Sequence, residues 1–199
     1  MENKSLNEKE SLELIARMIQ NTHNNLESRG YIGLLVNGYC TLFISLLVYF
    51  LVRYTHNNYY FLLWFGIILI GGLWEYFEKR NHPKRVTTFI DRVVSYVWIV
   101  LGIMIWITAG IAFFEPIPVL LLIALFANAG TAMTGLIIKF KALTIGGFIG
   151  IGLSFSLIFI TSLECILIFA AIFLFCMIIP GHILQQAEKK NRIKSERYV

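Results

Sequence analysis

The chain has 199 residues and a net charge of +5, and it is 57% hydrophobic and 15% aromatic. Together with a mean hydropathy of +0.70, this composition excludes an ordinary soluble domain. Apolar runs close to or above the ~18 residues of a spanning helix recur along the chain, which predicts an all-α integral membrane protein. The three cysteines form no C-x-x-C pair, so we expect neither a disulfide framework, nor a metal site, nor a cofactor.

Residues 1–30 predict a cytoplasmic amphipathic helix that ends near Gly30. Ser5 and Glu8 form a capping-box pattern at its start. The apolar stripe that follows at helical spacing is Leu12, Ile15, Ala16 and Ile19. Four basic and five acidic residues give this segment a net charge of −1, so anionic lipid would not attract it. We expect it to dock on its own bundle or on a partner, and a solvated, mobile helix is the alternative.

Residues 31–184 are predicted to form six transmembrane helices, and 185–199 a basic cytoplasmic tail. The links are short, so successive helices must be antiparallel. The longest link contains Pro83, which stops a helix. The expected spans are 31–53, 58–77, 90–113, 117–138, 142–160 and 163–183.

The distribution of lysine and arginine predicts the orientation. Of 17 such residues, four precede the first span, five lie from Lys79 to Arg92, two lie at the turn at Lys139 and Lys141, and five follow Gln185. Only Arg53 lies on the opposite side. Because cytoplasmic loops are enriched in basic residues, both termini are expected in the cytoplasm of a cell with an inner membrane. The positive charge is then a topology signal, and no nucleic-acid partner is expected.

The two segments that flank the turn at Lys139 are rich in small residues, which let helix backbones approach closely in lipid. These positions are Ala124, Ala127, Asn128, Thr131 and Gly135 before the turn, and Gly146 and Gly150 after it. We expect this hairpin to be the centre of the bundle. Its small-residue faces, like the N-terminal helix, are also candidates for contact with a protein partner or a second copy of the chain.

Several short motifs in and after this hairpin form a pattern: Thr134-Gly135, Lys139-Phe140-Lys141, Leu143, Gly146-Gly147 and Ile179-Pro180-Gly181. In these residues the chain resembles a loose group of small bacterial polytopic inner-membrane proteins of unknown function. The resemblance implies a helical membrane fold and supplies no catalytic residue. Those proteins usually have a proline directly after K-F-K, where this chain has Ala142. We expect Pro180 and Gly181 to break the last helix near the cytoplasmic surface.

Uncharged polar residues recur along the first and fourth spans. They are Asn37, Thr41 and Ser45 in the first, and Asn128, Thr131 and Thr134 in the fourth. One interpretation is interhelical hydrogen bonding, worth about 0.6 kcal/mol for an average pair. The other is a polar seam around a small amphiphile or lipid head group, which requires Asn37 and Asn128 to face one cavity.

Ionisable residues inside lipid mark candidate sites, because their burial is costly. Near the cytoplasmic surface the sequence places a charge cluster of Glu75, Lys79, Asp91 and Arg92. Glu75 and Lys79 are spaced for an ion pair. A metal or acid–base site of Glu75, His82 and His182 is conceivable, although its spacing matches no known ligand pattern.

The sequence therefore favours a non-enzymatic membrane protein that serves as an interaction or accessory subunit. The alternative is a small transporter or binding protein for a lipophilic or amphiphilic small molecule. An intramembrane enzyme would require Glu75 and the two histidines to converge within hydrogen-bond reach, about 3 Å.

Overall fold

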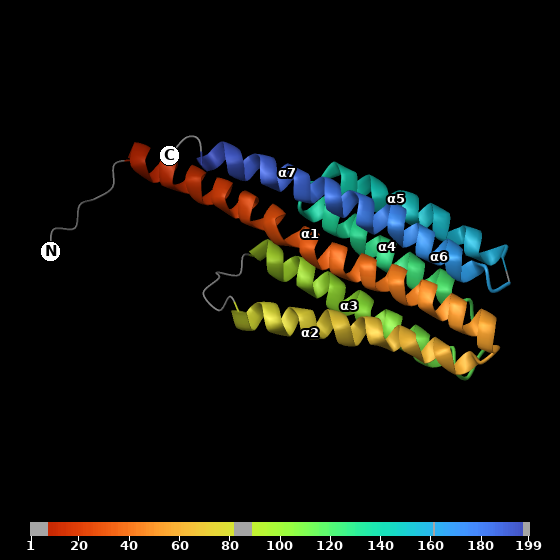
Figure 1. Cartoon of the computed structure of the whole chain (residues 1–199). Coiled ribbons are helices and arrows are strands. Elements are labelled where there is room, and N and C mark those ends of the chain that lie inside the picture. The colour runs from red at the N-terminus through yellow and green to blue at the C-terminus, as the bar shows by residue number, and fades with distance from the viewer. Residues whose placement is uncertain (1–7, 82–88, 161, 197–199) are drawn as a thin grey trace.

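The computed structural model describes residues 8–81, 89–160 and 162–196, and all regular structure in these ranges is helical. The elements are α1 (Glu8–Thr55), η1 (Asn58–Trp64), α2 (Phe65–Asn81), α3 (Phe89–Ile111), α4 (Val119–Ile137), α5 (Lys141–Ser154), η2 (Phe155–Ile158), α6 (Cys165–Phe173), η3 (Leu174–Ile178) and α7 (Ile179–Glu196). The chain runs back and forth along one bundle (Figure 1). The predicted all-α membrane bundle is therefore confirmed.

The described residues contain five segments that are long and apolar enough to cross a membrane: Ile32–Thr55, Phe89–Ile111, Val119–Ile137, Lys141–Ile158 and Cys165–Ala187. They match five of the six predicted spans. The remaining one, predicted at 58–77, is helical through η1 and α2, but its apolar part, Asn58–Trp74, is shorter. The count is accordingly five to six.

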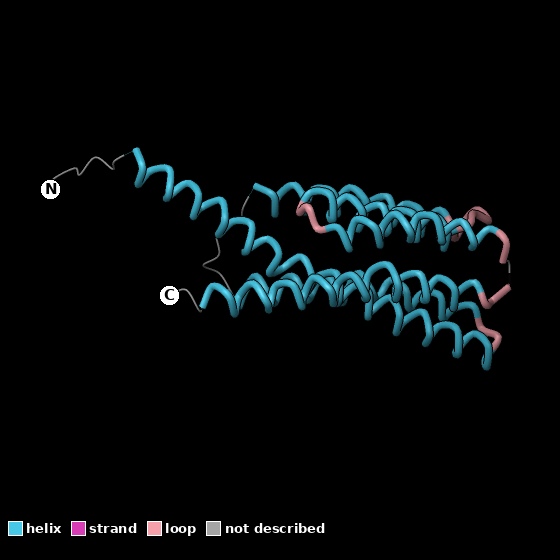
Figure 2. The backbone as a smooth tube through the Cα atoms, turned by 90° about the horizontal axis from the view of Figure 1, so that it is seen from above, coloured by secondary structure: helices cyan, strands magenta, loops and turns pink. Residues whose placement is uncertain are grey.

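The predicted helix end near Gly30 is wrong, because α1 continues without a break from Glu8 to Thr55. A glycine costs a helix about 1 kcal/mol relative to alanine, too little to end one when no proline or turn residue follows. At 1.5 Å per residue, the 48 residues of α1 are about 72 Å long. Figure 2 shows the first part of α1 leaving the bundle at an angle. The side chains of its predicted apolar stripe lie outside the part that the structure describes.

The helices form two layers, which Figure 2 shows edge on. One layer consists of α3, α4 and α5. The other consists of α1, α2 and the continuous helix formed by α6, η3 and α7 (Cys165–Glu196), which we call the α6–α7 rod. Within the layers α4 packs on both α3 and α5, and α1 packs on α2, α6 and α7. Between the layers α6, η3 and α7 pack against α4 and α5. The hairpin of α4 and α5 therefore lies at the centre of the contacts, as the small-residue pattern predicts.

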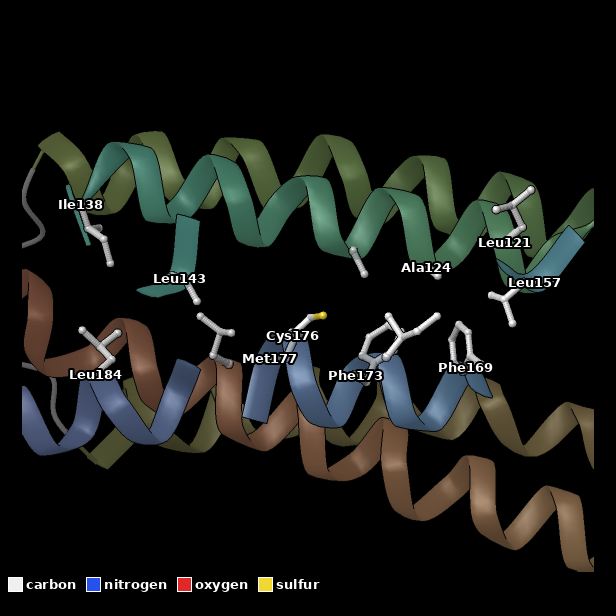
Figure 3. Packing of buried hydrophobic residues seen from close by; sticks show 13 residues of the cluster. Leu121, Ala124, Ile138, Leu143, Leu157, Phe169, Phe173, Cys176, Met177 and Leu184 are labelled. Carbon is white, nitrogen blue, oxygen red and sulfur yellow. The ribbon is translucent and has the colours of Figure 1, made fainter. Parts of the chain in front are cut away.

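The core fills the space between α4 and the α6–α7 rod. In Figure 3, Leu121 and Ala124 of α4 face Phe169, Phe173 and Cys176 of the rod. All five are at most 7% exposed. Lipid tails are as apolar as these side chains, so close packing, rather than transfer from water, holds the layers together in a membrane. The outer surfaces of α2 and α3 instead expose large apolar side chains, such as Leu69, Leu73, Ile103 and Ile107.

The helix break predicted at Pro180 and Gly181 is also wrong, since α7 runs through both residues to Glu196. Proline lacks an N–H, so Pro180 cannot donate to the carbonyl of Cys176, four residues earlier. The chain responds by widening the preceding turn into the π-helix η3, in which the Ile179 N–H bonds to the carbonyl of Leu174. The helix thus accommodates Pro180 through a wider turn and continues beyond it.

Candidate functional site

Helices α4 and α5 approach each other closely at two glycines, Gly135 and Gly147. A Cβ added to Gly135 would lie 2.7 Å from Oγ1 of Thr144, and one added to Gly147 would lie 2.6 Å from Cα of Ala132. Real Cβ atoms essentially never come so close to another atom. The backbones can therefore meet only because both positions are glycine.

Asn128 continues this contact toward the C-terminal end of α5. Its side chain is 1% exposed, and its Nδ2 donates to the carbonyl of Ala124 at 2.8 Å and to Oγ of Ser154 at 3.4 Å. Its Oδ1 points at Gly150 and has no hydrogen-bond partner among the described groups. A Cα–H of glycine is a weak donor, so contact with Gly150 gives this oxygen partial compensation. Asn128 thus lies in a packed helix contact.

The predicted contact of Gly146 and Gly150 with neighbouring helices is confirmed. Gly150 faces Asn128, and Gly146 faces the α6–α7 rod, where a Cβ would lie 2.7 Å from Cγ of Pro180 and 3.3 Å from the carbonyl oxygen of Cys176. That carbonyl is the one left without its usual partner by Pro180. The missing side chain of Gly146 therefore makes room for the widened turn.

The two threonines of α4 use their hydroxyl groups within helix contacts. Thr131 is fully buried and donates to the carbonyl of Ala127 at 2.9 Å. Thr134 donates to the carbonyl of Gly130 at 2.7 Å and accepts the indole N–H of Trp98 in α3 at 3.1 Å. This indole bond ties α3 to the centre of the bundle.

The polar residues of α1 lie in other contacts. Asn37 is exposed, donates to the carbonyl of Gly33 at 2.9 Å, and places its Oδ1 3.0 Å from where a Cβ of Gly71 in α2 would lie. Thr41 and Ser45 are buried, and Oγ of Ser45 lacks a hydrogen-bond partner among the described groups. Asn37 therefore faces α2 while Asn128 faces α5, and the two asparagines belong to different helix contacts.

The predicted charge cluster is only partly described. Asp91 is half-buried in the first turn of α3, where its carbonyl accepts a hydrogen bond from Ser95, and Arg92 is exposed. Glu75 and Lys79 belong to α2, but their side chains lie outside the described part, as does all of His82. Within the described residues, no group of three His, Cys, Asp or Glu is placed to hold a metal ion.

His182 pairs with a residue that sequence reasoning did not single out. The hydroxyl of Tyr39 in α1 lies 2.7 Å from its Nε2, and Oε1 of Gln185 lies 3.3 Å from its Nδ1. A neutral ring with its proton on Nδ1 would donate to this carbonyl oxygen and accept the Tyr39 hydroxyl at Nε2. His182 thus links α7 to α1.

A second pair missed by sequence reasoning lies at the other end of the bundle. Nη1 of Arg53 is 3.4 Å from Oε1 of Glu164, the residue that precedes α6. A hydrogen bond from Ser162 lowers the pKa of Glu164 most, followed by its own backbone N–H and the charge of Arg53. The sequence signal for this pair is Arg53, a single arginine at the end of an apolar run, but nothing in the sequence points to Glu164 as its partner.

In comparisons with known proteins, no family model, no curated protein sequence and no solved structure matches this chain. The resemblance to small bacterial membrane proteins therefore rests on the motif residues alone. Function must be argued from the geometry of the bundle.

Proposed function

We propose that this chain is a non-enzymatic integral membrane protein that acts as an interaction or accessory subunit. One observation carries the proposal: the polar groups of α4 serve helix packing. Asn128, Thr131 and Thr134 are at most 2% exposed and bond to backbone carbonyls within α4 or to neighbouring helices. Side chains used in this way hold a scaffold together, and they are not presented to a substrate.

The extended first helix supplies the surface for a partner. The apolar span begins at Ile32, so residues 8–31 of α1 continue beyond it for about 36 Å. This part leaves the bundle at an angle (Figure 2). A helix that projects in this way, with an apolar stripe in its sequence, is suited to docking on another protein.

The orientation that we propose has both termini in the cytoplasm and the bundle in the inner membrane. The start of α1, the end of α7 and the turn between α4 and α5 lie at one end of the bundle, and the end of α1 lies at the other (Figure 1). Arg53 belongs to the last turn of α1. Sixteen of the 17 basic residues then fall on one side, as the positive-inside rule requires. In a cysteine-free background, Asn57→Cys should react with an impermeant maleimide added to intact cells, and Glu196→Cys should not. Labelling of position 196 would reverse the orientation.

The function is tested by cross-linking in native membranes. Replacing the stripe residues Leu12, Ile15 and Ile19 by serine should abolish cross-linked partners, because the apolar contact would be lost. Replacing the polar residues Asn21 and Asn25 by serine is the matched control, and should leave the partners in place. Identical cross-linking patterns for both variants and the unmodified protein would refute a docking role for this helix.

The alternative of a transporter or binding protein for a lipophilic molecule requires the two polar stripes to share a cavity. Asn37 contacts α2 and Asn128 contacts α5, so no observation favours this second function.

A further inference from the structure

A pocket opens at the end of the bundle opposite the start of α1. It lies where α1 ends, η1 begins and the chain enters α6. Its lining residues are Val52, Arg53, His56, Asn58 and Leu163, and its volume is about 520 Å³. Ligand pockets in proteins have volumes of about 300–1,000 Å³, so a small polar group fits here.

The backbone around this pocket is held in a defined shape. His56 has a φ of 52°, in the left-handed region that non-glycine residues rarely adopt, and its N–H bonds to the carbonyl of Val52 at 2.9 Å. Asn57 caps η1 by accepting the N–H of Tyr59 at 2.9 Å. A left-handed residue directly after the last turn, with this hydrogen bond, is a common way for a helix to end. These hydrogen bonds fix the backbone that carries Arg53, His56 and Asn58, and the apolar side chains of Val52 and Leu163 complete the lining.

One charged residue, Arg53, lines the pocket, and a residue of opposite charge, Glu164, lies directly beside it without lining it. Arg53 lines the pocket, and its partner Glu164 lies 3.4 Å away, with side-chain exposures of 58% and 49%. A guanidinium has five N–H donors in a planar fork that suits phosphate. The one contact with Glu164 does not employ all of these donors. A simple anion beside Arg53 would also lie close to the carboxylate of Glu164, which would repel it. A ligand with a phosphate and an ammonium group complements both residues.

The position of the pocket at the ends of two spanning helices points to a membrane lipid as the source of that ligand. Arg53 is near the end of the span Ile32–Thr55, and Glu164 directly precedes the span Cys165–Ala187. Tyr54 and Tyr59, which flank the pocket in sequence, are 80% and 79% exposed, as in the aromatic belts at lipid head groups. We propose that this pocket binds the phosphoethanolamine head group of a phospholipid, with the phosphate at Arg53 and the ammonium at Glu164.

Native mass spectrometry of the full chain in detergent tests the proposal. The protein is titrated with phosphatidylethanolamine, with phosphatidylglycerol of the same acyl chains, and with soluble phosphoethanolamine. We expect preferential retention of phosphatidylethanolamine. Arg53→Gln and Glu164→Gln should each weaken this retention about threefold to fivefold, the size expected for an exposed charge pair. Arg92→Gln, at an exposed arginine of the other end, is the matched control and should change nothing.

Three outcomes would overturn the proposal. Equal retention in the Arg53→Gln and Arg92→Gln variants would mean that the pocket does not bind the lipid. Stronger retention of phosphatidylglycerol in Glu164→Gln, with no loss of phosphatidylethanolamine, would mean that the pocket accepts any anion. Displacement of the lipid by an equal concentration of soluble phosphoethanolamine would exclude a membrane lipid as the ligand. Thermal unfolding of each variant, measured alongside, separates lost binding from lost folding.

Discussion

The side-chain amide of Asn128 in α4 lies directly against the backbone of Gly150 in α5. A Cβ at Gly150 would come within 3.0 Å of Nδ2 of Asn128 and closer still to its Oδ1. The pair is complementary, because the buried amide fills the space that the missing side chain leaves. The central hairpin of the bundle depends on this match.

Gly150→Ala should therefore destabilise the protein by about 1–3 kcal/mol, the usual cost of overpacking a well-packed core. The matched control is Gly152→Ala, two residues along α5, where a Cβ would meet no atom within 4 Å. That substitution should stabilise the helix by up to about 1 kcal/mol, because alanine has the higher helix propensity. Thermal unfolding in detergent measures both. If the two variants shift the melting temperature equally, the contact of Asn128 with Gly150 is not tight.

The indole of Trp98 should contribute to the attachment of α3. Trp98→Phe removes the N–H that Thr134 accepts at 3.1 Å, which should cost about 0.6 kcal/mol, or at most about 1.7 kcal/mol. In a double-mutant cycle with Thr134→Val, the second substitution should cost less once the indole N–H is absent. Trp106→Phe, at an indole that is 51% exposed, controls for the change of ring. Strict additivity of the two substitutions would show that the bond contributes nothing.

The turn between α4 and α5 should become more stable with glycine at position 139. Lys139 has a φ of 57°, and the Phe140 N–H bonds to the carbonyl of Gly135 in the pattern of a Schellman motif, which glycine usually closes. Since this backbone costs a non-glycine residue about 1–2 kcal/mol, Lys139→Gly should stabilise the protein by up to about 1 kcal/mol after the entropy cost of glycine. Lys141→Gly, at the first residue of α5, should instead destabilise it. A loss of stability in both variants would mean that the charge of Lys139 matters more than its backbone.

Much of the fold could be predicted from the sequence because lipid imposes simple rules. Apolar length identifies a spanning helix, and the glycines at 146, 147 and 150 mark where helix backbones meet. The structure differs from the sequence pattern where local signals are weak. Gly30 suggests a helix end that no proline or turn residue enforces, and Pro180 suggests a break that a π-helical turn absorbs.

The partners of individual polar side chains were harder to predict, because they depend on how distant segments meet. Tyr39 and His182 are 143 residues apart, and Arg53 and Glu164 are 111 residues apart. Neither separation leaves a periodic pattern in the sequence. The sequence also could not predict which helix the side chain of Asn128 contacts. The helix period places Asn128 on one face of α4 but does not identify the helix that packs against that face.

The native mass of the protein extracted from its own membrane tests the proposed accessory role most directly. The full chain should carry additional protein mass beyond its own 22.8 kDa, and a variant without residues 1–28 should lose that mass while it remains inserted. The spans alone satisfy the insertion rules, so the deletion should not prevent membrane assembly. The same additional mass, or none, in both forms, together with amide exchange in residues 8–28 of the full chain as fast as in a free peptide, would contradict the account.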